Sequence, residues 1–560
     1  MTMNTAIRPM YEWKTINWTK VQRNVFKLQK RIYQASMRGD IISMRKLQKL
    51  LLKSKAAKLL AVRKVTQDNQ GKKTAGIDGI RKLTPVQRMK LSNQDLLEAN
   101  VKPTRRIWIP KPNSDEKRPL GIPVMKDRAA QALVKLALEP EWEARFEPNS
   151  YGFRLGRSVH DAIEAIFLSI KSKPKYVLDA DIEKCFDKIS HEKLLTKLNT
   201  IPSLRRLIRA WLKAGVLEDN VFNQTEQGTP QGGVISPLLA NIALHGMEQI
   251  VKEKFPVRGG PILIRYADDF LIFHKDLAVI NHCKATIELW LTDIDLNLKK
   301  EKTRIAHTLL QDEHGNRGFD FLGMHIGQYN VGKTHTGKSN YGKPLGFKTF
   351  IRPSKKSQKK QHKAIQNIVR RNRTIEQERL IEQLNPVIRG WSKFHSTVVS
   401  KKVFSNMSHK LFQSLRRWAN RRHPNKTQTW VNRKYWRLET GRWTFAARKG
   451  KPLRLYSETP IIRHIKVKEN RSPYDGDWSY WGARLGRYPT LSNRKAMLLR
   501  KQKGRCSICK LQFTLGDDMD TDHIIPLHLG GNDVWANVQL LHAHCHITKT
   551  RNDSLLHIND

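Results

Sequence analysis

Two adjacent carboxylates, Asp268 and Asp269, lie between two short apolar runs in residues 262–273, which read ILIRYADDFLIF. Apolar runs rich in β-branched and aromatic residues favour strands, so the pattern predicts a β-hairpin with the two carboxylates at its turn. Adjacent carboxylates beside buried strands repel each other unless cations neutralise them. The segment is therefore a candidate site for Mg²⁺, which prefers oxygen ligands and is often held against phosphates.

A second acidic segment lies upstream, and it matters because one turn cannot surround two metal ions. Residues 176–189, YVLDADIEKCFDKI, begin as an apolar strand and then present Asp179, Asp181 and Asp187. The residues alone leave open which of these three carboxylates joins the pair. Without such a partner, the pair would be an ordinary acidic turn between two core strands. The two segments together predict a metal site assembled from separate strands.

A different set of metal-ligating residues lies near the end of the sequence. Cys506 and Cys509 form one Cys-x-x-Cys pair, and His542 and Cys545 form a His-x-x-Cys pair. Four such ligands in two closely spaced pairs suit a tetrahedral structural Zn²⁺. His544 is a rival for the place of His542. Because the first residues, MTMNTAIRPMYEWK, lack the apolar core of a secretory signal, we expect metal ligands here rather than disulfides.

The composition points to a nucleic-acid partner. The sequence has 560 residues and a formal net charge of +53, so we expect several domains and a surface under strong positive potential. RNA and DNA phosphates match that potential. An anionic membrane would also attract it, but no stretch is long and apolar enough to span a bilayer. A basic structural protein of the ribosomal kind is the other alternative, and the long apolar blocks argue against it.

The order of the motifs resembles the multifunctional proteins encoded within bacterial or organellar group II introns, which combine reverse transcriptase, maturase and DNA endonuclease segments. The resemblance covers roughly residues 74–324, where seven matching segments follow one another in the family's order. These segments are RRIWIPKPNSDEKRPLGIPVMKDRAAQ (105–131), SYGFRLGRSVHDA (150–162), DADIEKCFDKI (179–189), QGTPQGGVISPLLANIAL (227–244), RYADDF (265–270), LNLKKEKT (296–303) and FDFLGM (319–324).

The resemblance assigns roles to the acidic residues of a polymerase palm. It favours Asp181 as the first metal-binding aspartate, because Asp181 heads the D-I-x-x-x-F pattern. Asp181 and Asp268 would bridge two Mg²⁺ ions, and Asp269 would complete the cluster. Phe186 matches the aromatic residue that excludes a ribose 2′-hydroxyl, which implies dNTP substrates and disfavours an RNA-dependent RNA polymerase. As a bare residue, Phe186 equally suits a hydrophobic core.

Several polar residues are candidates for contact with the incoming nucleotide. Lys111 and Arg118 lie on a predicted hairpin that can fold over a triphosphate and neutralise its charge, although template phosphate is an alternative ligand for both. Gln231 lies in a Gly/Pro-rich loop that permits close approach to a substrate. By resemblance, Gln231 lines the nucleotide pocket. Lys302 contacts the triphosphate or acts as a proton donor.

Between the two zinc-ligand pairs, DTDHIIPLHLGGNDVWAN at 520–537 resembles the HNH nuclease motif. In that family's arrangement, Asp522 and His546 hold one Mg²⁺ at the scissile phosphate. His523 removes a proton from water, and Asn537 orients the loop that carries His523. A lone histidine would be structural, and the ordered set of motifs favours the nuclease instead.

These observations predict a multidomain α/β protein with right-hand reverse transcriptase fingers and palm, an α-helical thumb or maturase domain, and a C-terminal ββα-metal HNH nuclease. The predicted boundaries are a basic helical extension (1–73), fingers and palm (74–331), a linker or basic loop (332–360), the thumb (361–429), a DNA-binding region (430–495) and the nuclease with its structural zinc (496–560).

The expected function has three parts: binding and stabilising folded intron RNA for splicing, nicking one strand of a DNA target, and copying the intron from the exposed 3′-hydroxyl. The expected partners are group II intron RNA, target DNA and dNTPs, without a membrane. The expected location is the bacterial cytoplasm, on nucleoid DNA, or an organelle. Two alternatives are an RNA-binding splicing cofactor with an idle polymerase, which Asp181, Asp268 and Asp269 argue against, and a host-defence reverse transcriptase, which the maturase-like and nuclease segments argue against.

Overall fold

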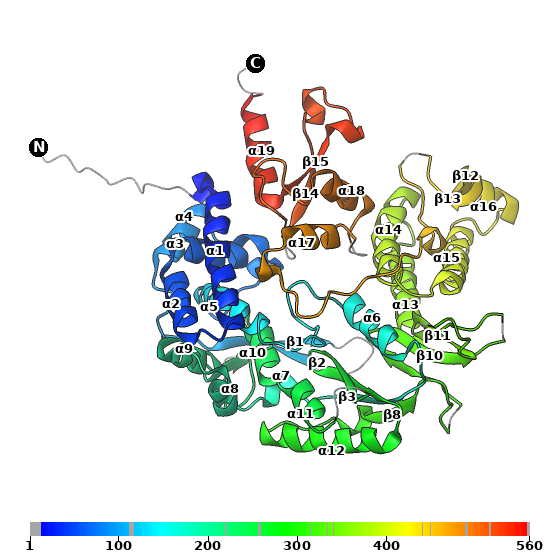
Figure 1. Ribbon diagram of the computed structural model, residues 1–560. Helices are drawn as coiled ribbons and strands as arrows, with labels where there is room; N and C mark the ends of the chain where they lie inside the picture. Colours follow the sequence, from blue (N-terminus) through cyan, green and yellow to red (C-terminus); the bar gives the residue numbers. More distant parts are fainter. Residues whose placement is uncertain are drawn as a thin grey trace, which may run out of the picture.

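The computed structural model in Figure 1 describes residues 13–110, 117–218, 221–255, 259–313, 315–332, 334–339, 341–439, 441–448, 450–487, 491–513 and 517–556. Lys111, a predicted nucleotide contact, lies outside the described residues. The described residues form several small sheets and four separate hydrophobic clusters. The predicted multidomain α/β fold is therefore confirmed.

The basic N-terminal segment is helical, as its pattern predicts. Buried residues recur along the first helix at helical spacing, including Val21, Val25 and Ile32, while Lys and Arg occupy its other faces. These helices pack on a long buried helix of the fingers. The buried helix is α5 (Met125–Glu143), and the helices that pack on it are α1 (Trp18–Met37), α2 (Ile41–Lys53) and α3 (Lys55–Arg63); α4 (Pro85–Asn93) packs on α3.

The predicted fingers hairpin is present. Strands β1 (Thr104–Pro110) and β2 (Lys117–Ile122) pair antiparallel, with Ile109 opposite Arg118. Two short strands extend this sheet in the order β2-β1-β4-β5, namely β4 (Val216–Glu218) and β5 (Val221–Asn223).

The central sheet has the strand order β6-β7-β3-β8, and its side chains alternate between two cores. Leu178 and Ile272 belong to the core that contains α12 (Leu277–Asp293), whereas Val177 and Leu271 belong to the core that contains α6 (Val159–Ile170). This alternation follows from the period of two in a strand buried on both faces. The strands are β3 (Tyr176–Asp181), β6 (Ile262–Tyr266), β7 (Asp269–His274) and β8 (Arg304–His307).

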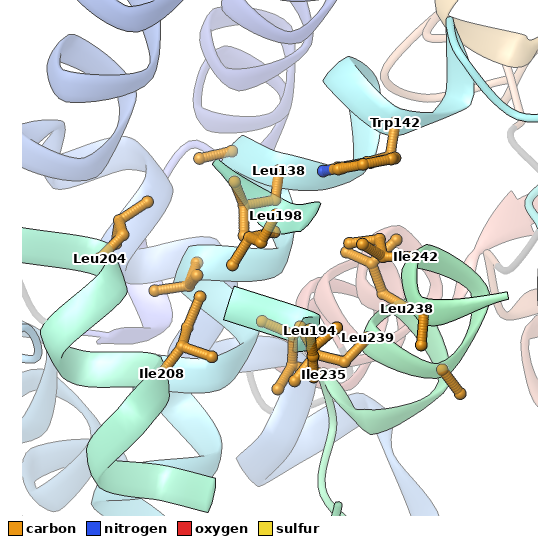
Figure 2. Close-up of a cluster of buried hydrophobic side chains, with 14 of the residues drawn as sticks. Leu138, Trp142, Leu194, Leu198, Leu204, Ile208, Ile235, Leu238, Leu239 and Ile242 are labelled. Atoms are coloured by element: carbon orange, nitrogen blue, oxygen red, sulfur yellow. The ribbon is translucent and has the colours of Figure 1, made fainter. Parts of the chain in front are cut away.

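Beside this sheet, apolar side chains from several short helices converge (Figure 2). Leu138 and Trp142 of α5 meet residues such as Leu198, Leu204 and Leu239. The cluster joins the fingers to the palm through continuous apolar contact. Its helices besides α5 are α8 (His191–Leu198), α9 (Pro202–Leu212) and α10 (Ser236–Ala243), and the short helices α7 (Cys185–Lys188) and α11 (Met247–Glu253) lie nearby in the same core.

The linker predicted at 332–360 needs correction. Strand β11 (Phe347–Pro353) pairs along its length with β10 (Met324–Asn330), which also pairs with β9 (Phe319–Phe321). Phe347 and Ile351 are buried within this strand despite the Lys- and Gly-rich surroundings that suggested a loop. A few apolar residues at even spacing are enough for a strand when a partner strand supplies the hydrogen bonds.

The thumb consists of helices that share one hydrophobic core, as the helical spacing of its apolar residues predicts. Ser354 caps the first of them by accepting a hydrogen bond from the backbone of Ser357 at 3.1 Å. The elements are α13 (Lys355–Arg371), α14 (Gln377–Phe394), α15 (Lys401–Arg422) and α16 (Gln428–Tyr435), followed by the hairpin of β12 (Trp436–Glu439) and β13 (Arg442–Phe445).

The chain then returns from the thumb to the palm (Figure 1). Asp161 of α6 is fully buried and accepts a hydrogen bond from the backbone N–H of Val467 at 2.8 Å. It also contacts His464 Nε2 at 3.2 Å and the guanidinium of Arg484 on α17 (Trp478–Leu485). Burial alone would raise the pKa of Asp161, but the contacts with His464 and Arg484 hold it far below its usual range.

We expect Asp161→Asn to loosen the return segment around 464–484 from the palm by about 3 kcal/mol, because it removes the buried negative charge that Arg484 and His464 both contact. Amide hydrogen exchange of this segment should accelerate. Glu164→Gln on the same helix is the control, because it makes the same carboxyl-to-amide exchange at a side chain whose pKa burial raises rather than one whose charge is stabilised by its contacts. Unchanged exchange in Asp161→Asn would contradict this account.

The C-terminal module places two antiparallel strands against a helix, the predicted ββα arrangement. In Figure 1 it stands beside the N-terminal helices, and one contact between them is Arg63 Nη2 to His544 Nδ1 at 2.7 Å. Its elements are α18 (Asn493–Lys501), β14 (Met519–His523), β15 (Val538–His542) and α19 (Ala543–Leu556).

Candidate active sites

The three predicted palm carboxylates lie at one end of strands β3 and β7, in the middle of the central sheet. Asp181 is the last residue of β3, and the strand register sets it directly opposite Asp269, the first residue of β7. Asp268 occupies the turn between β6 and β7. The hairpin predicted with carboxylates at its tip is therefore present.

Buried polar contacts fix the shape of this turn. Ala267 adopts a left-handed backbone with φ of 60°, and the fully buried Arg265 donates from Nη1 to the Ala267 carbonyl at 3.2 Å and to Asn241 Oδ1 at 3.1 Å. Gly152 packs so closely that an added Cβ would lie 2.3 Å from the Ala267 nitrogen. The SYGF segment thus needs a glycine where it supports the turn.

The electrostatics of the cluster favour a bound cation. Burial, together with the charges of the neighbouring Asp268 and Asp181, raises the pKa of Asp269 to about 7. Burial also raises the pKa of Asp268. Lys302 contacts Asp181, and although burial lowers the pKa of Lys302, the acidic cluster raises it overall. Clustered carboxylate oxygens whose ionisation is disfavoured are a fitting ligand set for a divalent metal, which would neutralise their charge.

The other two carboxylates of this region have different partners. Asp179 pairs with Arg304 Nε at 3.2 Å, and Asp187 accepts hydrogen bonds from Gln231 Nε2 at 3.1 and 3.2 Å. A cavity of about 660 Å³ adjoins Asp181 and Asp269. Its lining residues are Asp179, Ala180, Asp181, Asp269, Glu301, Lys302, Arg304, Asp320, Phe321, Leu322, Gly323, Ser354, Lys356, Ser357 and Lys360.

The other predicted nucleotide contacts lie around the carboxylate cluster. Phe186 lies half-buried, with its ring edge-on to Phe153 at a centroid separation of 6.1 Å, and its carbonyl accepts from the backbone of Thr229. Arg118 is exposed, and it lies near enough to Asp268 for its positive charge to oppose part of the rise that burial causes in the pKa of that carboxyl. The loop that carries Gln231 thus packs against the helix that carries Phe186.

In the nuclease module, two strand carboxylates face one histidine of the following helix. His546 Nδ1 lies 3.3 Å from Asp520 Oδ2, and His546 Nε2 lies 3.6 Å from Asp522 Oδ1. Asp520 was not predicted from sequence. The alternation of β14 would have indicated it, because residues two apart share a strand face. These side chains offer oxygen and imidazole ligands of the kind that a catalytic divalent metal uses.

The predicted base, His523, is the last residue of β14. His523 Nε2 lies 3.1 Å from Asp533 Oδ1, and the Asp533 carboxylate also contacts Arg494. Asn537 accepts a hydrogen bond from Ile525 N at 2.8 Å and donates to Ile525 O at 2.9 Å, which closes the loop behind His523. Asp533 and Arg494 were also missed, because Asp533 contacts His523, and Arg494 contacts Asp533, only through folding.

The four predicted zinc ligands converge. The ligand atoms of Cys506, Cys509, His542 and Cys545 all lie within 4.8 Å of one another. His544 does not join them, because its Nδ1 lies against Arg63. Three thiols and one imidazole at this spacing suit tetrahedral Zn²⁺.

Across the described part of the chain, no helix has the length and apolarity that a bilayer span requires.

Comparison with known proteins gives four family matches in succession. Residues 13–94 match the N-terminal domain of reverse transcriptase, and residues 109–326 match reverse transcriptase (RNA-dependent DNA polymerase). Residues 358–436 match the group II intron maturase-specific domain, and residues 506–552 match HNH endonuclease.

Similar proteins include YkfC of Escherichia coli K12, which is 32% identical over 309 residues, covering 47% of this chain and 78% of YkfC. The group II intron-encoded protein LtrA of Lactococcus lactis subsp. cremoris is 40% identical over 186 residues, 32% of this chain and only 30% of LtrA. Maturase-like protein 1 of Euglena gracilis is 28% identical over 323 residues, 55% of this chain and 64% of that protein.

The chain belongs to the group II intron-encoded proteins that join reverse transcriptase and maturase domains to a C-terminal HNH endonuclease. Its domains are those of an RNA-directed DNA polymerase and a DNA endonuclease, and both imply divalent metal ions. The Cys and His cluster suggests an additional zinc site.

Proposed function

We propose that this protein binds a folded group II intron RNA, assists its splicing, nicks one strand of a DNA target and copies the intron RNA from the exposed 3′-hydroxyl. The observation that carries the polymerase part is the register of Asp181 opposite Asp269, with Asp268 at the adjoining turn. That arrangement gathers three carboxylates whose mutual repulsion a bound cation would relieve.

In the polymerase, Asp181 and Asp268 would bridge two Mg²⁺ ions, with Asp269 beside them. Mg²⁺ bound there supplies activation of the primer 3′-hydroxyl and neutralises charge on the leaving pyrophosphate. Arg118 adds positive charge at the triphosphate, and its influence on Asp268 supports this placement. Lys302, held beside Asp181, would contact the triphosphate or donate a proton to the leaving group.

In the nuclease, Asp522 and His546 would hold one Mg²⁺ at the scissile phosphate. His523 would take a proton from the attacking water. The hydrogen bonds of Asn537 to the backbone of Ile525 support its role in fixing the loop that presents His523.

The ribonucleoprotein part is tested by the RNA that remains bound to the full-length protein after purification. Sequencing that RNA should reveal one group II intron strongly enriched over total cellular RNA. Bound RNA without any enriched intron would contradict the proposed partner.

We expect Phe186→Val to admit ribonucleotides, because a smaller side chain leaves room for the 2′-hydroxyl. The ratio of rNTP to dNTP incorporation should rise by about tenfold, as expected when a steric block of a few carbons is removed. Phe222→Ala, which changes an exposed aromatic of β5, is the control. An unchanged ratio in Phe186→Val would assign Phe186 to the core instead.

A further inference from the structure

A second hollow lies in the thumb, away from the palm carboxylates. Its volume is about 480 Å³, and it lies between the C-terminal parts of α13 and α15. These two helices run side by side in Figure 1. The lining residues are Gln366, Val369, Arg370, Arg373, Thr374, Ser414, Arg417, Trp418, Arg421, Arg422 and His423.

The charge of this hollow is entirely positive. Five of its lining residues are arginines and none is acidic, whereas the palm cavity mixes acidic and basic side chains. Within the described ranges, no carboxylate forms an ion pair with any of the five. Guanidinium groups crowded together without anions repel one another, and each retains donors for a phosphate or carboxylate.

Two residues that line the hollow, Trp418 and Arg422, are held by several contacts. Arg422 Nη1 donates to the carbonyls of Arg373 and Ile375, both at 3.0 Å, and its guanidinium lies 4.7 Å from the centre of the Trp418 ring. Trp418 is itself buried, and its Nε1 donates to the Asn372 carbonyl at 2.8 Å. Arg422 is thus held in place by these contacts. Three other lining arginines, Arg370, Arg417 and Arg421, are exposed to solvent.

An aromatic ring stands beside the hollow. Trp430 is 39% exposed, and its ring centroid lies 4.8 Å from that of His423, a lining residue. Lys434 Nζ and Lys426 Nζ lie 4.9 and 5.7 Å from the same ring. An exposed indole flanked by cations suits stacking of an unpaired base next to its phosphate.

We propose that this hollow and Trp430 bind a single unpaired nucleotide extruded from structured RNA, with its phosphates at the arginines and its base on Trp430. The volume is in the range of sites for ligands of nucleotide size. RNA is favoured over DNA because the maturase-specific match, 358–436, contains every residue of this site. In this respect the inference rests on the proposed function.

The test measures binding of the full-length protein to four synthetic probes at one fixed salt concentration, because affinity for phosphates depends on salt. The probes are an RNA hairpin with one bulged adenosine, the same hairpin fully paired, and the DNA versions of both. We expect the protein to prefer the bulged RNA over the paired RNA by about tenfold, the effect of one stacked base.

The preference should disappear in Trp430→Ala and in the triple variant Arg370→Gln, Arg417→Gln and Arg421→Gln. It should survive in two matched controls. Trp443→Ala removes another exposed tryptophan, and a second triple variant neutralises exposed thumb cations outside the hollow, namely Arg379→Gln, Arg389→Gln and Lys402→Gln.

Equal binding of bulged and paired RNA by the unaltered protein would overturn the proposal, and so would an equal preference for bulged DNA. A preference that survives in Trp430→Ala or in the hollow triple variant would overturn it as well. Primer extension by the same preparations tests the polymerase separately. Its failure would count against the proposed polymerase function and leave the bulge preference standing.

Discussion

Asp268→Asn should reduce the rate of dNTP incorporation by about 1,000-fold, which corresponds to about 4 kcal/mol of transition-state stabilisation. The substitution keeps the size of the side chain and removes one of the charges that the cluster offers to Mg²⁺. Because Arg265 and Gly152 hold the turn between β6 and β7, the turn should keep its shape in the variant. Removing one charge should also lower the pKa of Asp269, since Asp268 helps to raise it.

Single-nucleotide incorporation on an RNA template, measured over a range of Mg²⁺ concentrations, provides the readout. Asp293→Asn is a matched control, because Asp293 is an exposed aspartate at the end of α12, away from the acidic cluster. Asp293→Asn should keep the unaltered rate. A rate for Asp268→Asn within a few-fold of the unaltered protein would refute the role of the palm cluster.

Loss of zinc should unfold the nuclease module and leave the polymerase active. Cys545→Ala removes one of four ligands, and structural Zn²⁺ contributes about 10 kcal/mol or more to the folding of small metal domains. We expect one fewer zinc per chain, rapid proteolysis after the thumb, and no nicking of DNA. Primer extension should stay within about twofold, because the palm carboxylates lie in a separate core.

His544→Ala is the sharpest control for this prediction. The spacing in the sequence makes His544 a rival ligand, but its imidazole contacts Arg63 instead, so the zinc content should not change. Elemental analysis and plasmid nicking measure both variants. If Cys545→Ala retained its zinc, the assigned ligand set would be wrong. If Cys545→Ala lost both zinc and polymerase activity, the zinc module would not fold separately.

The local features of the sites could be predicted from sequence because they depend on short spacings. The apolar runs that flank Asp268 and Asp269 predict a hairpin, and the two ligand pairs predict a zinc cluster. Contacts between segments that are far apart in the sequence have no such short-range pattern. Arg63 and His544 are 481 positions apart, and nothing near either residue indicates their contact.

Two further differences have the same origin. Strand β11 differs from the predicted linker because its hydrogen bonds come from β10 and the residues before it are rich in Gly and Lys. Asp533 was not predicted to approach His523, because the loop between them closes only through Asn537. Pairing partners and loop closure are tertiary properties, whereas residue spacing reports mainly on secondary structure.

Primer extension by the full-length protein tests the central claim most directly. The reaction contains a synthetic RNA template, an annealed DNA primer, Mg²⁺ and the four dNTPs. With the unaltered protein, we expect DNA products that reach the end of the template. With the Asp181→Asn variant, we expect no such products. If the unaltered protein binds the template and primer tightly but adds no nucleotide, the polymerase assignment is wrong and the protein acts as an RNA-binding splicing cofactor.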